Sequence, residues 1–335
     1  MKSITVLTPG FLPTIQDLGR YGYQKYGVIV SGVMDAYSMR LANILVGNAE
    51  NEAVIELTMM GPSLSLSKGS LISIAGANLS PTIDGIEVPM LRPIYIREAC
   101  ILKFGQCSSG CRCYVAAAGG FDIPIFMESK STYLRAKIGG KDGRALKKDD
   151  VLTLGAMGEL SMNIAKKLEL EANGKDSFVF SRWHPSNIRK QSSETVTIRV
   201  FEDRQFDNVS NKSIKEFFNS SFSIDSKSDR MGYRLNGPKI ELKDKIEMIS
   251  EEVSFGTIQV PPDGNPIILL ADRATAGGYP KIAHVASYDL SKLVQLKPGD
   301  SVKFKKIILR EAEVLYLKRE RYLAELKKSV EALSR

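Results

Sequence analysis

The polar residues that could take part in chemistry are concentrated in four Gly-rich stretches of this 335-residue sequence. Carboxylates and guanidinium groups are costly to bury alone. They therefore either pair with one another or converge on a polar ligand that carries a carboxylate or an amide. Both alternatives stay open at this point. The candidates are Gln16, Asp17, Arg20, Ser31 and Asp35, then Arg135, Gly139, Gly140 and Arg144, then Ser228, Asp229 and Arg230, and finally Gln259, Asp263, Asp272, Thr275, Gly277, Gly278 and Tyr279.

The fourth stretch, residues 254–285, is the densest. Thr257–Val260 predicts a strand, and the Asp263-Gly264 pair predicts a hairpin-type turn after it. The next strand, Pro266–Ala271, is apolar on both faces, as in a fully buried strand. Asp272, Arg273, Thr275 and Tyr279 follow where this strand emerges into a loop, which is a common place for functional side chains.

Three residues are predicted to be catalytic. Asp272 and Asp263 are candidates for orienting the substrate or for transferring a proton. Arg230 is a candidate for stabilising negative charge that develops during a reaction. The remaining candidates are predicted to bind substrate.

Several other kinds of site are disfavoured. His184 and His284 are the only histidines, which leaves little for a histidine-dependent triad or a multi-histidine metal site, so we predict no metal. The sequence lacks a P-loop and a dinucleotide-binding GxGxxG unit. The four cysteines (100, 107, 111 and 113) are too few and too clustered for a secreted disulfide framework, and we expect core thiols. The Gly139–Arg144 loop could still bind an anion with its backbone amides.

The surrounding pattern predicts the elements that position these residues. Short strands separated by Gly, Pro and Asp recur between residues 64 and 117. Asp35 is a plausible N-cap for a helix from Ala36 to about Val46, and Ala156–Ser193 is predicted to be an irregular connection. An amphipathic helix is expected over Leu309–Leu333, which packs either on its own domain or on another subunit.

Two short stretches resemble each other. Leu146–Leu154 and Leu296–Phe304 each combine a Leu-Lys entry, a turn that ends in Asp and an alternating strand. Each is preceded by a Gly-Gly pair. The match predicts two related β-units, with chance similarity as the alternative.

Composition favours a soluble, cytoplasmic protein. No apolar run approaches the ~20 residues of a membrane helix, and Met1–Pro9 is strand-like where a signal peptide would be basic and then apolar. The net charge is +8, but the basic residues are mixed with 38 acidic ones along the chain, so neither a nucleic acid nor a membrane is expected as a partner.

The Gly-rich loops also carry a family resemblance. Residues 14–35, 117–122, 131–146, 228–235 and 257–285 together resemble the C-type subunit of bacterial 5-oxoprolinase. This is the KipA-type or allophanate hydrolase subunit 2 family, often labelled biotin-dependent carboxyltransferase. The similarity runs in the same order from about residue 3 to residue 305. Ala274 and Ala276 stand where the family commonly has Gln and Thr. The expected functional contacts therefore lie instead at Gln259, Asp263, Asp272, Thr275 and the Gly277-Gly278-Tyr279 turn.

The resemblance implies a fold class and a domain division. We expect a mainly β protein of two cyclophilin-like β-barrel units with a few short helices and a C-terminal amphipathic helix. The expected domains are residues 1–190, 191–306 and 307–335.

The resemblance also implies a function. We expect this chain to be one subunit of a complex that also contains a B-type (KipI-like) and an A-type subunit. The complex would hydrolyse 5-oxo-L-proline to L-glutamate with ATP, and this chain would be inactive alone. One alternative is a KipA-type binding protein that antagonises a KipI-type kinase inhibitor. Another is carboxyl transfer to a small amide from carboxybiotin on a partner. The chain has no Met-Lys-Met segment, so no covalently attached biotin is expected on it.

Overall fold

The computed structural model describes residues 1–172, 176–185, 195–244 and 247–334. The chain forms two compact units. The first contains Met1–Gly19, Asp35–Gln191 and Tyr322–Arg335, and the second contains Arg20–Met34 and Ser192–Arg321. The expected boundary between residues 190 and 191 lies outside the described residues. In this division the segment 20–34 counts with the second unit, and the residues after 306 are divided between the two units.

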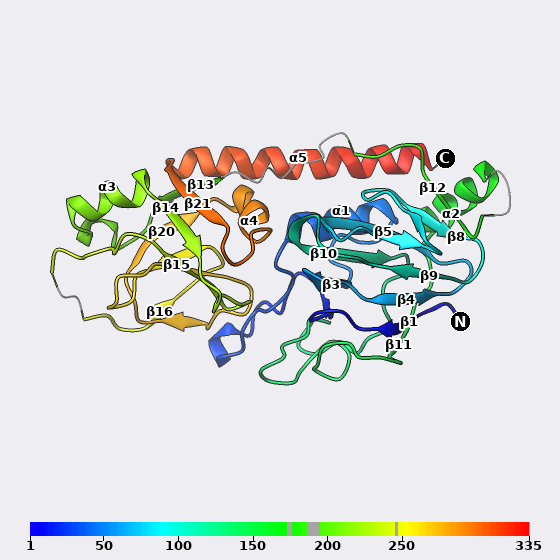
Figure 1. Ribbon diagram of the computed structural model, residues 1–335, viewed down its shortest axis with the longest axis horizontal. Coiled ribbons are helices and arrows are strands. Elements are labelled where there is room, and N and C mark those ends of the chain that lie inside the picture. Colours follow the sequence, from blue (N-terminus) through cyan, green and yellow to red (C-terminus); the bar gives the residue numbers. More distant parts are fainter. Residues whose placement is uncertain (173–175, 186–194, 245–246, 335) are drawn as a thin grey trace. The chain divides into compact units, whose positions relative to one another are not determined.

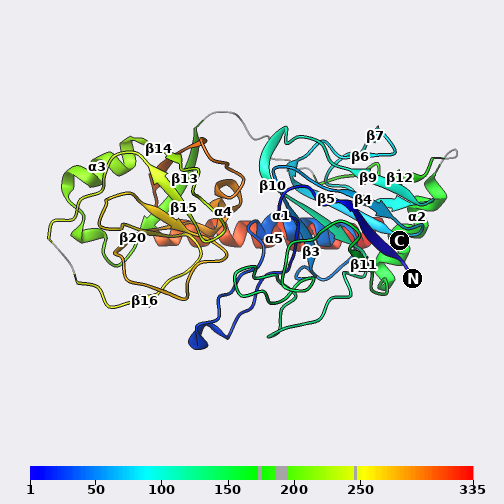
Figure 2. The ribbon, with the colours of Figure 1, turned by 60° about the horizontal axis from the view of Figure 1, so that its bottom comes forward.

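The first unit contains two six-stranded sheets that share one apolar core. Figure 2 shows β6 and β7 at the edge of the first sheet opposite β11. In order, the strands of that sheet are β11 (Val151–Thr153), β1 (Ser3–Thr8), β4 (Ser63–Leu66), β9 (Cys100–Lys103), β6 (Thr82–Ile83) and β7 (Ile86–Glu87). Those of the second are β12 (Phe178–Phe180), β8 (Ile94–Ile96), β5 (Leu71–Asn78), β10 (Ser109–Ala117), β3 (Val54–Thr58) and β2 (Thr14–Gln16).

The second unit is a closed seven-stranded barrel with its own core. A two-stranded ribbon of β16 (Glu251–Glu252) and β19 (Ala276–Gly277) accompanies it. In order, the barrel strands are β13 (Val196–Glu202), β20 (Lys281–Val285), β17 (Thr257–Gln259), β18 (Ile267–Leu269), β15 (Gly232–Asn236), β14 (Ser221–Ile224) and β21 (Ser301–Lys306). The predicted mainly β class is confirmed.

Five α-helices lie among the described residues. They are α1 (Ala36–Leu45), α2 (Glu159–Glu171), α3 (Asn211–Asn219), α4 (Ser287–Leu293) and α5 (Leu309–Leu333). Helix α1 packs on β5 and β10 of the second sheet (Figure 1). The predictions of α1 and α5 are confirmed. In α5, Leu323, Leu326 and Val330 are buried, so this face packs on the chain itself, the first of the two alternatives above.

The prediction that Ala156–Ser193 is irregular is wrong, because it contains α2 and β12. The buried residues of α2 are Ser161, Ile164, Ala165 and Leu168, which lie on one helical face. Charged residues surround this narrow stripe, so the segment is polar in overall composition and its helical pattern is weak.

All four cysteines are in the thiol form, and three of them are buried. The Cys107 thiol is partly buried and donates to the Gly110 carbonyl. Burial raises the pKa of Cys100 to about 12 and that of Cys113 further, so these thiols stay protonated and act as core side chains.

The two similar stretches form the same turn. Asp150 accepts a hydrogen bond from the Lys147 N–H at 2.8 Å, and Asp300 accepts one from the Lys297 N–H at 3.0 Å. The residue before each aspartate has a positive φ, 68° and 89° respectively. In the first unit, the backbones of Asp149 and Asp150 exchange two hydrogen bonds with Val6 of β1. In the second unit, those of Gly299 and Asp300 do the same with Ile224 of β14. The sequence match therefore corresponds to a repeated local structure.

Candidate functional site

Three predicted site residues meet in the second unit. The Arg230 guanidinium donates to both carboxylate oxygens of Asp272, with Nε–Oδ2 at 2.9 Å and Nη2–Oδ1 at 3.1 Å. The Ser31 hydroxyl donates to Oδ1 of the same carboxylate at 2.8 Å. All three side chains are buried. Both carboxylate oxygens are engaged, so Asp272 is placed to orient the Arg230 guanidinium and the Ser31 hydroxyl.

Backbone geometry explains why these residues meet. The N–H of Asp272 donates to the Arg230 carbonyl at 2.8 Å, which continues the pairing of β18 with β15. Ser31 has a φ of 57° and is followed by Gly32 at 88°. Positive φ is uncommon outside glycine, so the contacts of this turn must hold it. The Arg230 side chain also donates to the Gly32 carbonyl, and Met34 is buried in the barrel core.

A second group joins the loop that follows Asp272 to the neighbouring strands β17 and β20. The Gln259 amide donates to the Tyr279 carbonyl at 3.0 Å. A Cβ at Gly277 would lie 2.7 Å from Gln259 Nε2, so a larger residue there would displace the Gln259 amide. Sequence reasoning missed Lys281, which is buried and pairs with Glu251 at 2.7 Å. A lysine at the start of an apolar strand is the signal that could have identified it.

Asp17 organises a separate group in the first unit. Its carboxylate accepts hydrogen bonds from the Ser129 hydroxyl at 2.7 Å, from the Ser131 hydroxyl, and from the Lys130 and Gly19 N–H groups at 2.6 and 2.8 Å. Ser129 was missed because nothing in its local sequence sets it apart. These contacts explain Asp17 as a loop-ordering residue.

Gln16 lies beside this group and is completely buried. Its amide nitrogen donates to the Thr14 hydroxyl and to the Thr132 carbonyl, both at 3.1 Å. Its Oε1 has no hydrogen-bond partner among the described residues.

Contacts within the chain engage part of the Gly139–Arg144 loop. The N–H of Gly140 donates to the Lys130 carbonyl, and that of Gly143 donates to the Gly139 carbonyl. Arg144 makes a two-point ion pair with Asp150, at 2.6 and 2.8 Å. This pairing lowers the pKa of Asp150. The N–H groups of Gly140 and Gly143 and the Arg144 guanidinium are thus engaged within the chain.

Asp263 is not brought to the Asp272 cluster. Its exposed carboxylate accepts hydrogen bonds from the N–H and the side-chain amide of Asn265, at 3.1 and 3.0 Å. These bonds lower the pKa of Asp263. The arrangement is an Asx turn that shapes the loop.

The other predicted residues take several positions. Ser228 and Asp229 order the turn that precedes β15, where their side-chain oxygens accept N–H groups of Arg234 and Met231. Arg20 is fully buried, and its N–H closes the 20–30 loop on the Val30 carbonyl. Thr275 and Gly278 lie on the same loop as Tyr279, which is 44% exposed, whereas Arg135 is exposed in the first unit.

Asp35 is the N-cap of α1, and replacing it tests that role. Its carboxylate accepts from the Ser38 N–H at 3.1 Å and from the Ser38 hydroxyl at 2.7 Å. We expect Asp35→Ala to lower the free energy of unfolding by about 1 kcal/mol, and Asp35→Ser, which keeps a cap, to cost less. Urea unfolding of both variants measures this. Equal losses in the two would exclude the capping role.

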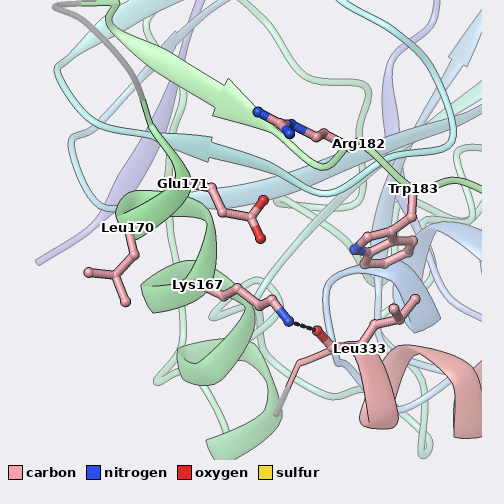
Figure 3. A pocket seen from close by; sticks show the side chains of 6 residues that line it. All are labelled: Lys167, Leu170, Glu171, Arg182, Trp183 and Leu333. Carbon is pink, nitrogen blue, oxygen red and sulfur yellow. Dashed lines mark hydrogen bonds between the residues drawn. The ribbon is translucent and has the colours of Figure 1, made fainter.

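A shallow hollow of about 650 Å³ lies elsewhere in the first unit. Figure 3 shows Lys167 donating to the Leu333 carbonyl at one side of it, at 2.8 Å. None of the predicted site residues lines it. The lining residues are Lys167, Leu170, Glu171, Arg182, Trp183 and Leu333.

Metal-binding clusters and membrane-spanning helices are both absent from the described part of the chain. Its His, Cys, Asp and Glu side chains form no group of three or more that is arranged to hold a metal ion. None of its helices is both long enough and apolar enough to cross a membrane.

Comparison with known proteins gives consistent matches. The chain is 36% identical over 318 residues to the C-type 5-oxoprolinase subunit of Haemophilus influenzae, covering 95% of this chain and 96% of that one. It is 30% identical to the C-type 5-oxoprolinase subunit of Escherichia coli, covering 96% and 97%. The crystal structure of the K. lactis urea amidolyase superposes with a TM-score of 0.84 at 29% identity, over 97% of this chain but only 20% of that one. The family model described as carboxyltransferase domain, subdomain A and B, matches residues 26–306. This chain therefore belongs to the carboxyltransferase subdomain A and B family.

Proposed function

We propose that this chain is the C-type subunit of an ATP-dependent 5-oxoprolinase, which hydrolyses 5-oxo-L-proline to L-glutamate together with A-type and B-type subunits. The observation that carries the proposal is the sequence identity to two C-type 5-oxoprolinase subunits. The two C-type 5-oxoprolinase subunits are matched over almost their whole chains, whereas the match spans a fifth of the urea amidolyase.

The chemistry of the site supports a role in orienting the substrate and in stabilising negative charge on its carbonyl oxygen. A five-membered lactam is an unreactive amide, and attack by water places negative charge on its carbonyl oxygen. Arg230, held by Asp272, is a cationic group suited to such charge. In the Gly139–Arg144 loop, the N–H groups of Gly140 and Gly143 and the Arg144 side chain are engaged within the chain, so they are not available to a triphosphate. We therefore assign nucleotide binding to another subunit.

Reconstitution tests this proposal. The chain is co-expressed with the A-type and B-type subunits from the same organism, and glutamate release from 5-oxo-L-proline is measured with and without ATP. We expect activity only when all three chains and ATP are present. Full activity of the A–B pair alone would refute the proposal, and would favour a binding protein that acts on its B-type partner.

Carboxyl transfer is a second candidate, favoured by the family model and by the urea amidolyase match. It requires carboxybiotin on a partner. A streptavidin blot of the purified complex distinguishes the two functions. A biotinylated chain that co-purifies would favour carboxyl transfer, and an ATP-dependent 5-oxoprolinase that contains no biotin would exclude it.

A further inference from the structure

Arg273 follows Asp272 and is partly buried, yet it contacts only backbone carbonyls. Its Nε donates to the Val253 carbonyl at 3.3 Å, and its Nη1 donates to the Leu270 carbonyl at 3.2 Å. Within the described residues, no carboxylate forms an ion pair with it.

Three other arginines of the chain each pair with a carboxylate. Arg230 pairs with Asp272, Arg199 with Asp289 and Arg144 with Asp150, each at 2.9 Å or less. A guanidinium removed from water without a counter-charge is costly. Burial accordingly lowers the pKa of Arg273, and the nearby Tyr21 and Asp272 offset part of that effect.

The remaining N–H donors of Arg273 lie on the 272–279 loop, which is predicted to bind substrate. A guanidinium has five N–H donors, and the two carbonyl contacts use two of them. The three that remain include both on Nη2, which together with Nη1 forms the edge that binds a carboxylate at two points. The same loop carries Thr275 and Tyr279.

We propose that Arg273 binds the carboxylate of a small anionic ligand at the 272–279 loop. If the proposed function holds, this ligand is 5-oxo-L-proline, and Arg273 selects it over neutral lactams and amides. The carboxylate would supply the counter-charge that the chain itself does not provide.

Calorimetric titration of the full chain, alone and in the complex, tests this with three probes. These are 5-oxo-L-proline, 2-pyrrolidinone, which is the same lactam without the carboxylate, and cyclopentanecarboxylate, which has the carboxylate without the lactam. We expect Arg273→Gln to weaken binding of the two carboxylates by about 10- to 100-fold and to leave 2-pyrrolidinone unchanged. Arg273→Lys should retain part of the affinity. Arg234→Gln, at an exposed position of the same unit, should change nothing.

The probes separate this inference from the proposed function. Carboxylate affinity equal to wild type in a folded Arg273→Gln variant would overturn the inference, as would failure of the wild type to bind either carboxylate. Arg273-dependent binding of cyclopentanecarboxylate without any hydrolysis of 5-oxo-L-proline by the complex would support the anion site and refute the 5-oxoprolinase assignment.

Discussion

Asp272→Asn is expected to lower the free energy of unfolding of the second unit by about 3–5 kcal/mol. The substitution keeps the size of the side chain but removes the negative charge. Arg230 is 8% exposed in its side chain and would then lose the carboxylate with which it pairs. The Ser31 hydroxyl would also lose a charged acceptor, which loosens a turn that holds a serine at positive φ.

The measurement must report on the second unit. Trp183 is the only tryptophan and belongs to the first unit, so its fluorescence is unsuitable. Urea unfolding followed by circular dichroism, with hydrogen exchange of β15 and β18, reports directly on the barrel. Asp207→Asn is the matched control, because Asp207 is exposed in the same unit and should change stability by less than about 0.5 kcal/mol.

A double variant separates the pair from its surroundings. Replacing Asp272 with Asn and Arg230 with Met removes both charges, so we expect it to cost less than the sum of the two single changes. If Asp272→Asn behaves like the Asp207→Asn control, the buried ion pair is not a stabilising element and the orienting role loses its basis.

Asp289→Asn is expected to have an effect of similar size, about 3–5 kcal/mol at pH 7, and to change the response to acid. Asp289 is completely buried and accepts hydrogen bonds from the Arg199 backbone N–H at 3.0 Å and side chain at 2.7 and 2.6 Å. It also pairs with Lys292 at 3.0 Å. Burial alone would raise the pKa of Asp289, but the hydrogen bonds from Arg199 and Lys292 outweigh burial and lower it.

The direction of the pH dependence follows from this lowered pKa. An unfolded aspartate titrates near about 3.9. The stabilisation is therefore fully present above that pH and is lost as the pH falls through the lower pKa of the folded state. Unfolding midpoints in urea at pH 7, 5, 4 and 3 should show the gap between wild type and Asp289→Asn closing only below about pH 4. A gap that stays constant to pH 3 would contradict the assignment, and Asp207→Asn again serves as the control.

The sequence predicted the helices and turns that are specified by residues close to one another in the chain. Asp35 followed by an apolar stripe predicted α1, and Leu326 and Val330 among charged residues predicted the buried face of α5. The paired turns at Lys147–Asp150 and Lys297–Asp300 were also visible in the sequence, because a turn is specified within a few residues.

Long-range pairing could not be predicted from composition or spacing. Ser31 and Asp272 are 241 positions apart, and Asp17 and Ser131 are 114 apart. Arg144 and Asp150 are close in sequence, but whether that guanidinium is free or paired depends on how the loop closes. The sequence places Arg273 on a loop, but only the structure shows that it bonds to two carbonyls and, among the described residues, pairs with no carboxylate.

The interleaved path of the chain through its two units also constrains how the protein is made. Residues 20–34 leave the ribosome early, but the barrel that buries Met34 is encoded by residues 192–321. The first unit in turn is completed by residues 322–335. Domains usually fold in order during synthesis, but here neither unit can be finished before nearly the whole chain has emerged. We therefore expect truncation after residue 191 to yield a fragment that needs chaperones, with an apolar segment at 29–34 left uncovered.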